Sequence, residues 1–206
     1  MAATLLDGDL PAELVRRIRS DGQVAIDTET SGLDWSTDQL QLCQIFAPST
    51  GVVLLRNVTD TPTGLGQLLD DPGILKIFHF APFDLRFLEA HWGLRARGIS
   101  CTKAASKLLT PSAPPGDHSL QSLALRYLKL NLPKGRVRTS DWGAQSLSPE
   151  QIEYASNDVS HLIDLNAILA TRIEEDGLTS LLADVCAYIP VDCHLEVCEI
   201  PNPLTY

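Results

Sequence analysis

The sequence of 206 residues lacks the marks of a membrane-spanning or secreted protein. It contains no apolar run near the ~18 residues that a membrane-spanning helix requires. Its first residues do not combine a basic start with a long apolar stretch, so we expect no secretory signal and a cytoplasmic location. An apolar content of 44% and a charged content of 20% are ordinary for a globular chain of this length. One domain with a sizeable core is therefore predicted.

The cysteines are few and show no metal-binding or disulfide pattern. There are five, none of them in a C-x-x-C pair, so neither a zinc ribbon nor a disulfide framework is predicted. We expect reduced thiols. Cys193 and Cys198 lie close together in the sequence, which leaves open a disulfide between them.

Basic residues are nearly missing from the last third of the chain. Residues 140–206 hold one base, Arg172, against 12 acids, whereas residues 1–139 hold 15 bases against 14 acids. Affinity for a long nucleic acid depends on neutralising many phosphates, so a formal charge of −10 is unfavourable for that partner. A very short nucleic acid, which has few phosphates, is not excluded.

Apolar periodicity and turn residues predict an α/β domain in which a mixed sheet is flanked by helices. Strands are expected at 23–29, 40–48, 51–58 and 74–80, with the middle two forming a hairpin. Helices are expected at 8–22, 65–71, 81–93, 100–109, 119–130, 148–177 and 178–189. We expect an irregular segment at 131–148 and an extended tail from 190 to 206.

Two acids follow the apolar run Val24–Ile26 in the stretch "AIDTETSGLDW". Alternate residues of a strand point to the same side, so Asp27 and Glu29 should project together. Such close like charges repel unless a cation lies between them, which suggests a metal site. The alternative is a pair of solvated acids at the end of a strand.

Three further residues are candidates for the same site. Asp84 begins a helix after the strand at 74–80, which is where α/β ligand sites form; it could also be a helix-start residue favoured by the dipole. Tyr154 and Asp158 are four residues apart and share one helix face.

The ordered segments "AIDTETSGL", "HFAPFDL" and "YASNDV" resemble the three motifs of the DEDD (DnaQ-like) 3′–5′ exonucleases, in the subgroup with a tyrosine in the third motif. "CTKAASKLL", "TSDW" and "LSPEQIEYASNDV" extend the resemblance to the ribonuclease D-like members. The sequence is most similar to the short stand-alone nanoRNase C group. The resemblance implies a ribonuclease H-like fold in a single domain, over residues 1–190, with a tail at 191–206 that contacts other copies.

The resemblance also implies which residues hold metal. Asp27, Glu29, Asp84 and Asp158 would be the ligands of two divalent cations, Mg²⁺ or Mn²⁺, which prefer oxygen ligands. Four carboxylates balance the charge of two such ions. Tyr154 would orient or deprotonate the attacking water, and its ordinary pKa of about 10 means that nearby metal charge is needed for deprotonation.

Substrate contacts are predicted around these carboxylates. Thr30 would meet the 3′-terminal nucleotide, and Leu33 would wedge between bases; core packing is the alternative for Leu33. His79 could contact the phosphate or sugar, and Phe83 could stack on a base, unless both belong to the core. Lys134, Ser140 and Trp142 lie in "LPKGRVRTSDW", where the basic residues could hold a 5′ phosphate or form a solvated loop face.

These observations predict a 3′–5′ exoribonuclease that releases nucleoside 5′-monophosphates from short RNA, with dinucleotides favoured. The resemblance implies a homo-oligomer, with an octamer expected. One alternative is a ribonuclease D-like enzyme that trims longer structured RNA or acts on DNA. Another is an inactive binding or scaffold protein with the same fold.

Overall fold

The computed structural model describes residues 3–132 and 136–204, and its centre is a six-stranded mixed sheet in the order β1-β4-β3-β2-β5-β6. The strands are β1 (Thr4–Asp7), β2 (Gln23–Thr30), β3 (Leu40–Ala47), β4 (Gly51–Arg56), β5 (Leu75–Phe78) and β6 (Ile99–Cys101). β2 pairs antiparallel with β3 and parallel with β5. β3 and β4 form the predicted hairpin.

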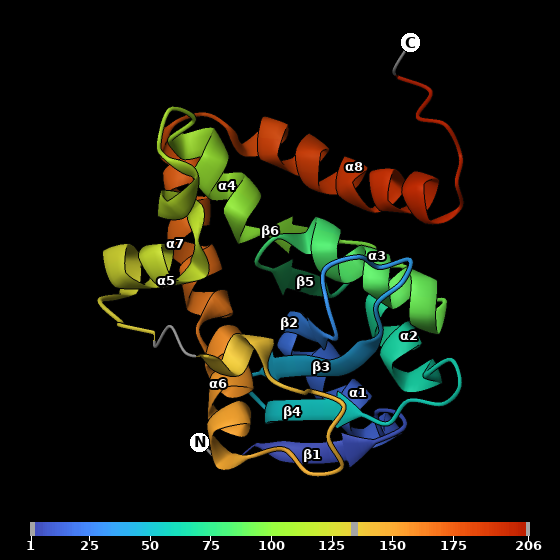
Figure 1. Cartoon of the computed structure of the whole chain (residues 1–206). Coiled ribbons are helices and arrows are strands. Elements are labelled where there is room, and N and C mark those ends of the chain that lie inside the picture. The colour runs from blue at the N-terminus through green and yellow to red at the C-terminus, as the bar shows by residue number, and fades with distance from the viewer. Residues whose placement is uncertain (1–2, 133–135, 205–206) are drawn as a thin grey trace.

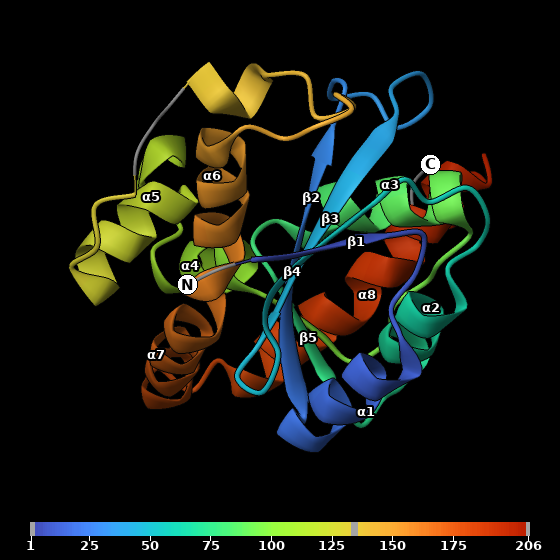
Figure 2. The ribbon, with the colours of Figure 1, turned by 90° about the horizontal axis from the view of Figure 1, so that it is seen from below.

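Helices cover both faces of the sheet (Figures 1 and 2). They are α1 (Ala12–Asp21), α2 (Thr63–Asp70), α3 (Ala81–Trp92), α4 (Thr102–Leu109), α5 (Leu120–Leu123), α6 (Pro149–Ser160), α7 (Leu162–Glu175) and α8 (Thr179–Val197). Short 3₁₀ turns span Pro115–His118 and Arg136–Thr139, and a π turn spans Ala124–Leu128. In Figure 2, α1, α2, α3 and α8 lie on one side of the sheet, and α5, α6 and α7 lie on the other.

The alternation of side chains along β2 divides the core in two. Val24 and Ile26 are fully buried in the cluster shared with α1, α2, α3 and α8, whereas Ala25 belongs to the cluster shared with α5, α6 and α7. By the same alternation Asp27 and Glu29 lie on the face that α6 covers. Thr28 points to the opposite face, toward α3.

The helix predicted over 148–177 is in fact two helices, because the backbone leaves helical geometry at His161 (φ −113°, ψ −1°). The break lets each half follow a different surface. α6 packs on β2, β3 and β4, whereas α7 packs most extensively on α4 and also on β2 and β5. The predicted start of α6 is confirmed by a capping box between Ser148 and Gln151.

The extended tail predicted from residue 190 is also wrong for its first half, since α8 continues through Pro190 to Val197. A proline inside a helix removes one backbone donor, and packing must offset that loss. Cys193, beyond the proline, is 1% exposed and packs in the core under α3. The cysteines are all free thiols, so the open disulfide between Cys193 and Cys198 is not formed.

The sequence prediction also missed two short strands, β1 and β6, which lie at the two edges of the sheet. Within residues 3–132 and 136–204, no helix combines the length and apolar character needed to cross a membrane.

Candidate active site

The site begins at the end of β2, where Asp27 and Glu29 project on one side of the sheet. Their neighbour on β3 is Gln44, which pairs in register with Asp27 and is fully buried. The Gln44 Nε2 donates to Glu29 Oε1 at 3.1 Å and lies 3.5 Å from Asp27 Oδ2. One amide group therefore contacts both carboxylates.

Asp84 comes from the first turn of α3, across the end of the sheet, and is 2% exposed. The Thr28 hydroxyl donates to its Oδ1 at 2.7 Å, which ties α3 to β2. The turn before α3 contains Phe80 at φ 81°, a left-handed conformation that is unusual for a bulky residue. This strained turn brings α3 to the carboxylates directly after β5.

The third part of the site is α6, which places Tyr154 and Asp158 on one face as predicted. Oxygen atoms of Asp27, Glu29 and Asp158 all lie within 4.8 Å of one another. The Tyr154 hydroxyl donates a hydrogen bond to the Asp158 carboxylate. Three segments that are far apart in sequence thus converge.

Burial makes this cluster electrostatically unfavourable without a cation. Desolvation raises the pKa of Asp84 and that of Asp158 to about 7. The pKa of Asp27 is raised well above its ordinary value by desolvation and then by the charges of Asp84, Asp158 and Glu29. Desolvation and the neighbouring carboxylates also raise the pKa of Tyr154. All four side chains are therefore held in an environment that favours nearby positive charge.

A cavity of about 490 Å³ opens beside the carboxylates. The predicted substrate residues Thr30, Leu33, His79, Phe83 and Ser140 all line it. Leu33 is 85% exposed, so its side chain stands free at the cavity and is not a core residue. The core alternative for Leu33 is therefore wrong in this structure.

One further predicted contact residue, Trp142, does not line the described cavity. Trp142 is 2% exposed and packs behind Tyr154, with ring centroids 6.0 Å apart. It supports the tyrosine from the core, and direct contact with a substrate would need a rearrangement. Lys134 lies outside the described residues.

His79 is half-buried and hydrogen-bonded, with its Nδ1 2.9 Å from the Thr102 hydroxyl. Burial, followed by the charge of Lys103, lowers the pKa of His79 to about 3. The imidazole is consequently neutral near pH 7, so any contact with a phosphate would be a hydrogen bond and not an ion pair.

Sequence reasoning missed several residues at the cavity. Phe80 and Lys103 both line it, and the Lys103 Nζ lies 4.4 Å from the centroid of the Phe80 ring. Gln44 and Thr28 support the carboxylates from behind. Their side chains carry no motif signal of their own, because their roles depend on strand register and on the turn before α3.

The fold and the site together define a nuclease of the ribonuclease H-like class, and comparison with known proteins gives the family. Residues 3–174 match the family model described as 3′–5′ exonuclease, and the chain belongs to this family. The predictions of fold class and of a ribonuclease D-like exonuclease are confirmed.

Relatives and solved structures agree with this assignment. Ribonuclease D of Gluconacetobacter diazotrophicus is 32% identical over 180 residues, covering 85% of this chain and 44% of that protein. The structure of Brucella melitensis NrnC with bound Mg²⁺ superposes with a TM-score of 0.87 at 32% identity, covering all of both chains. Escherichia coli RNase D gives a TM-score of 0.83 at 26% identity over 94% of this chain and 51% of that one. The chain spans about half the length of the ribonuclease D proteins that it matches.

Proposed function

We propose that this protein is a metal-dependent 3′–5′ exoribonuclease that releases nucleoside 5′-monophosphates from short RNA, with dinucleotides as favoured substrates. The observation that carries the proposal is the convergence of buried carboxylates from β2, α3 and α6 beside one cavity. Such a cluster is costly unless it binds cations. A cytoplasmic location remains part of the proposal.

The donor set fits a pair of hard divalent cations. Asp27, Glu29 and Asp158 offer oxygen atoms within 4.8 Å of one another, and Asp84 completes the set from α3. Carboxylate oxygens are the ligands that Mg²⁺ and Mn²⁺ prefer. When bound, two such ions would stabilise the attacking and leaving oxygens of an in-line phosphodiester displacement.

The remaining side chains are suited to hold the substrate and the water. Tyr154, which contacts Asp158 and packs against Trp142, would orient a water molecule in the cavity. Leu33 and Phe83 present apolar surface for bases, whereas His79 and Ser140 present polar atoms for the sugar or phosphate.

Three features support a short substrate. A second structure of Brucella melitensis NrnC is a complex with pGG, and that protein is 32% identical to this chain. The cavity of about 490 Å³ is in the range of pockets that enclose small ligands. The last third of the sequence, with one base against 12 acids, offers little for a long phosphate backbone.

A substrate-length series tests the proposal. We would compare a 5′-labelled RNA dinucleotide with a short RNA, a long RNA and a DNA of matched sequence, each with Mg²⁺ and with Mn²⁺. We expect kcat/KM for the dinucleotide to exceed that for the long RNA by at least about tenfold. Comparable values would favour the ribonuclease D-like alternative, and no hydrolysis of any substrate would favour the inactive one. Asp158→Asn is the control and should be inactive throughout.

The homo-oligomer, with an octamer expected, is also a proposal. Tyr188 and Val191 on α8, and Ile200 beyond it, are large apolar side chains exposed on this chain. Light scattering measures the assembly directly. A monomeric mass at working concentration would reject it.

A further inference from the structure

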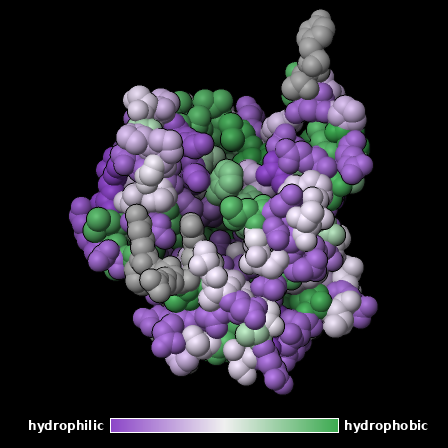
Figure 3. All heavy atoms as spheres, in the orientation of Figure 1, coloured by the Kyte–Doolittle hydropathy of each residue, from purple (hydrophilic) through white to green (hydrophobic). Residues whose placement is uncertain are grey.

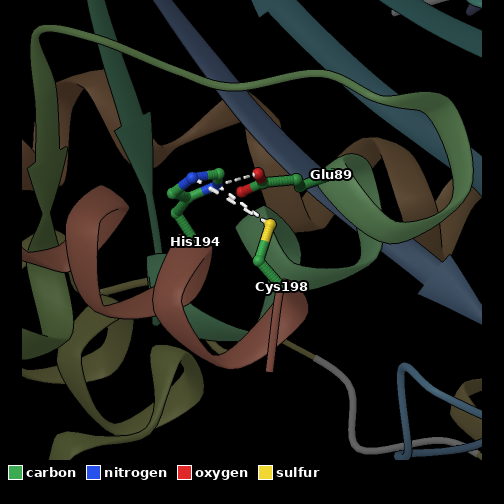
Figure 4. Close-up of side chains that lie close together, drawn as sticks. All are labelled: Glu89, His194 and Cys198. Carbon is green, nitrogen blue, oxygen red and sulfur yellow. Dashed lines mark hydrogen bonds and ion pairs between the residues drawn. The ribbon is translucent and has the colours of Figure 1, made fainter. Parts of the chain in front are cut away.

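A second cluster of metal-binding side chains lies where α8 ends against α3, apart from the cavity. Glu89 of α3, His194 of α8 and Cys198, the residue after α8, point toward one another (Figure 4). One ligand atom from each lies within 4.8 Å of the other two. None of the three lines the cavity, and the proposed exonuclease reaction does not use them.

The distance between two of the three ligand atoms suits a tetrahedral ion. The His194 Nδ1 lies 3.5 Å from the Cys198 Sγ. A zinc ion with Zn–N of about 2.0–2.1 Å and Zn–S of about 2.3 Å places those two atoms about 3.6 Å apart at the tetrahedral angle. The Glu89 Oε1 contacts the same Nδ1.

Glu89 and Cys198 both approach the same ring nitrogen of His194, which is not the arrangement of a catalytic relay. In a relay, a histidine contacts its orienting acid through one ring nitrogen and the nucleophile through the other. Here both Glu89 and Cys198 approach Nδ1, while the His194 Nε2 is 4.0 Å from the sulfur. The three ligand atoms therefore lie close enough together to bind one ion once the Glu89–His194 hydrogen bond opens.

The local structure also favours a cation. His194 and Cys198 are four residues apart and share a helix face. They lie at the C-terminal end of α8, where the helix dipole is negative. A competing cation is Arg95, whose Nε is 3.9 Å from Glu89 Oε1; its side chain is 52% exposed, so this ion pair is screened by solvent and weak.

We propose that Glu89, His194 and Cys198 bind one zinc-class transition-metal ion. A thiolate and a carboxylate balance its two positive charges, and the mixed sulfur, nitrogen and oxygen ligands favour zinc over magnesium. The fourth position faces solvent, since Cys198 is exposed. The ion fastens the end of α8 to α3, the helix that carries Asp84.

Co²⁺ provides a test specific for sulfur. The metal-stripped protein is titrated with Co²⁺ alone, and the thiolate-to-cobalt absorption band is recorded; Zn²⁺ is then added. We expect the band to saturate at an amplitude that corresponds to one thiolate-bound cobalt per chain and to disappear as zinc displaces cobalt. The carboxylates of the cavity bind through oxygen and give no such band.

Matched variants locate the ion. Cys198→Ser should abolish the band, and His194→Ala or Glu89→Gln should weaken cobalt binding at least about tenfold. Glu196→Gln changes a residue in the same turn that pairs with Arg86, and it should leave both the band and the affinity for cobalt unchanged. Circular dichroism confirms that each variant is folded. Absence of the band from the wild type, or its persistence in Cys198→Ser, would overturn the proposal.

Discussion

At the scale of single residues, Gln44 is the least expected part of the site. It is fully buried, and its Nε2 contacts the carboxylates of both Asp27 and Glu29. Its Oε1 has no hydrogen-bond partner among residues 3–132 and 136–204. A buried amide with an unsatisfied oxygen is costly, so we infer that Gln44 is retained to position the two acids.

We predict that Gln44→Leu weakens Mn²⁺ binding about tenfold, the lower end of the effect of losing a partner of metal ligands. The expected cause is that Asp27 and Glu29 lose their shared donor and separate. Isothermal titration with Mn²⁺ measures the change, and Gln39→Leu, at an exposed position beside β3, is the control. Equal affinity for Mn²⁺ in wild type and Gln44→Leu would contradict the positioning role of Gln44.

Tyr154 gives the second prediction at this scale. Tyr154→Phe keeps the ring that packs on Trp142 and removes only the hydroxyl. We expect kcat to fall about 10²-fold, with little change in the affinity for a dinucleotide, because the proposed role of the hydroxyl is to orient water and not to bind substrate. Single-turnover kinetics and a binding titration separate the two effects. An equal loss in both would contradict the assigned role.

At the scale of elements, the helices and strands that carry the acids could be predicted because their signals are local. β2, α3 and the start of α6 each combine an apolar run with a turn or cap signal, and they position Asp27, Asp84 and Asp158. The edge strands β1 and β6 were missed because three or four residues give no clear periodicity. Phe80 was missed because its left-handed backbone depends on the tertiary fold.

The length of α8 shows how tertiary packing overrides a local signal. Pro190 suggests the end of a helix, yet α8 continues because Cys193 is buried and Arg86 of α3 pairs with Asp192 at 3.4 Å. A proline in a helix interior costs about 3 kcal/mol. Burial of one small side chain contributes about 1–2 kcal/mol, so the other contacts of α8 with α3 must offset the rest.

Truncation after Pro190 tests this explanation. We expect the melting temperature of the metal-free protein to fall by about 5 °C or more, because a few kcal/mol of packing on α3 is lost. The control is truncation after Asn202, which removes only residues beyond α8 and should leave the melting temperature unchanged. Equal melting temperatures for both would show that the second half of α8 adds no stability.

At the scale of the whole molecule, charge and hydropathy are unevenly distributed. The face in Figure 3 is largely hydrophilic, with apolar patches gathered toward its middle and upper part. The acidic last third of the sequence contributes α6, α7 and α8, and only Asp158 of its acids belongs to the carboxylate cluster. The last third of the chain therefore offers little positive charge to a polyanion, whereas Lys103 is a basic side chain in the cavity lining.

The buried carboxyls predict how stability depends on pH. Because the pKa values of Asp84 and Asp158 are about 7 in the folded protein and about 4 when unfolded, the folded state binds more protons between these values. This contribution is complete below about pH 4 and is lost as the pH rises through about 7. The free energy of unfolding of the metal-free protein should therefore fall from about pH 5 to about pH 8.

Urea unfolding at a series of pH values measures this dependence. Asp158→Asn should show a shallower fall, and Mn²⁺ should restore stability at the higher pH. A stability that rises with pH in the metal-free wild type, with the same slope in the variant, would mean that folding does not raise the pKa values of these carboxyls.

Crystals soaked in Mn²⁺, with anomalous diffraction recorded for wild type and Asp27→Ala, give the most direct view of the site. We predict anomalous peaks among the oxygens of Asp27, Glu29, Asp84 and Asp158 in the wild type, with at least one lost in the variant. A wild-type map with no manganese between these four carboxylates would contradict the assignment of a metal-dependent nuclease.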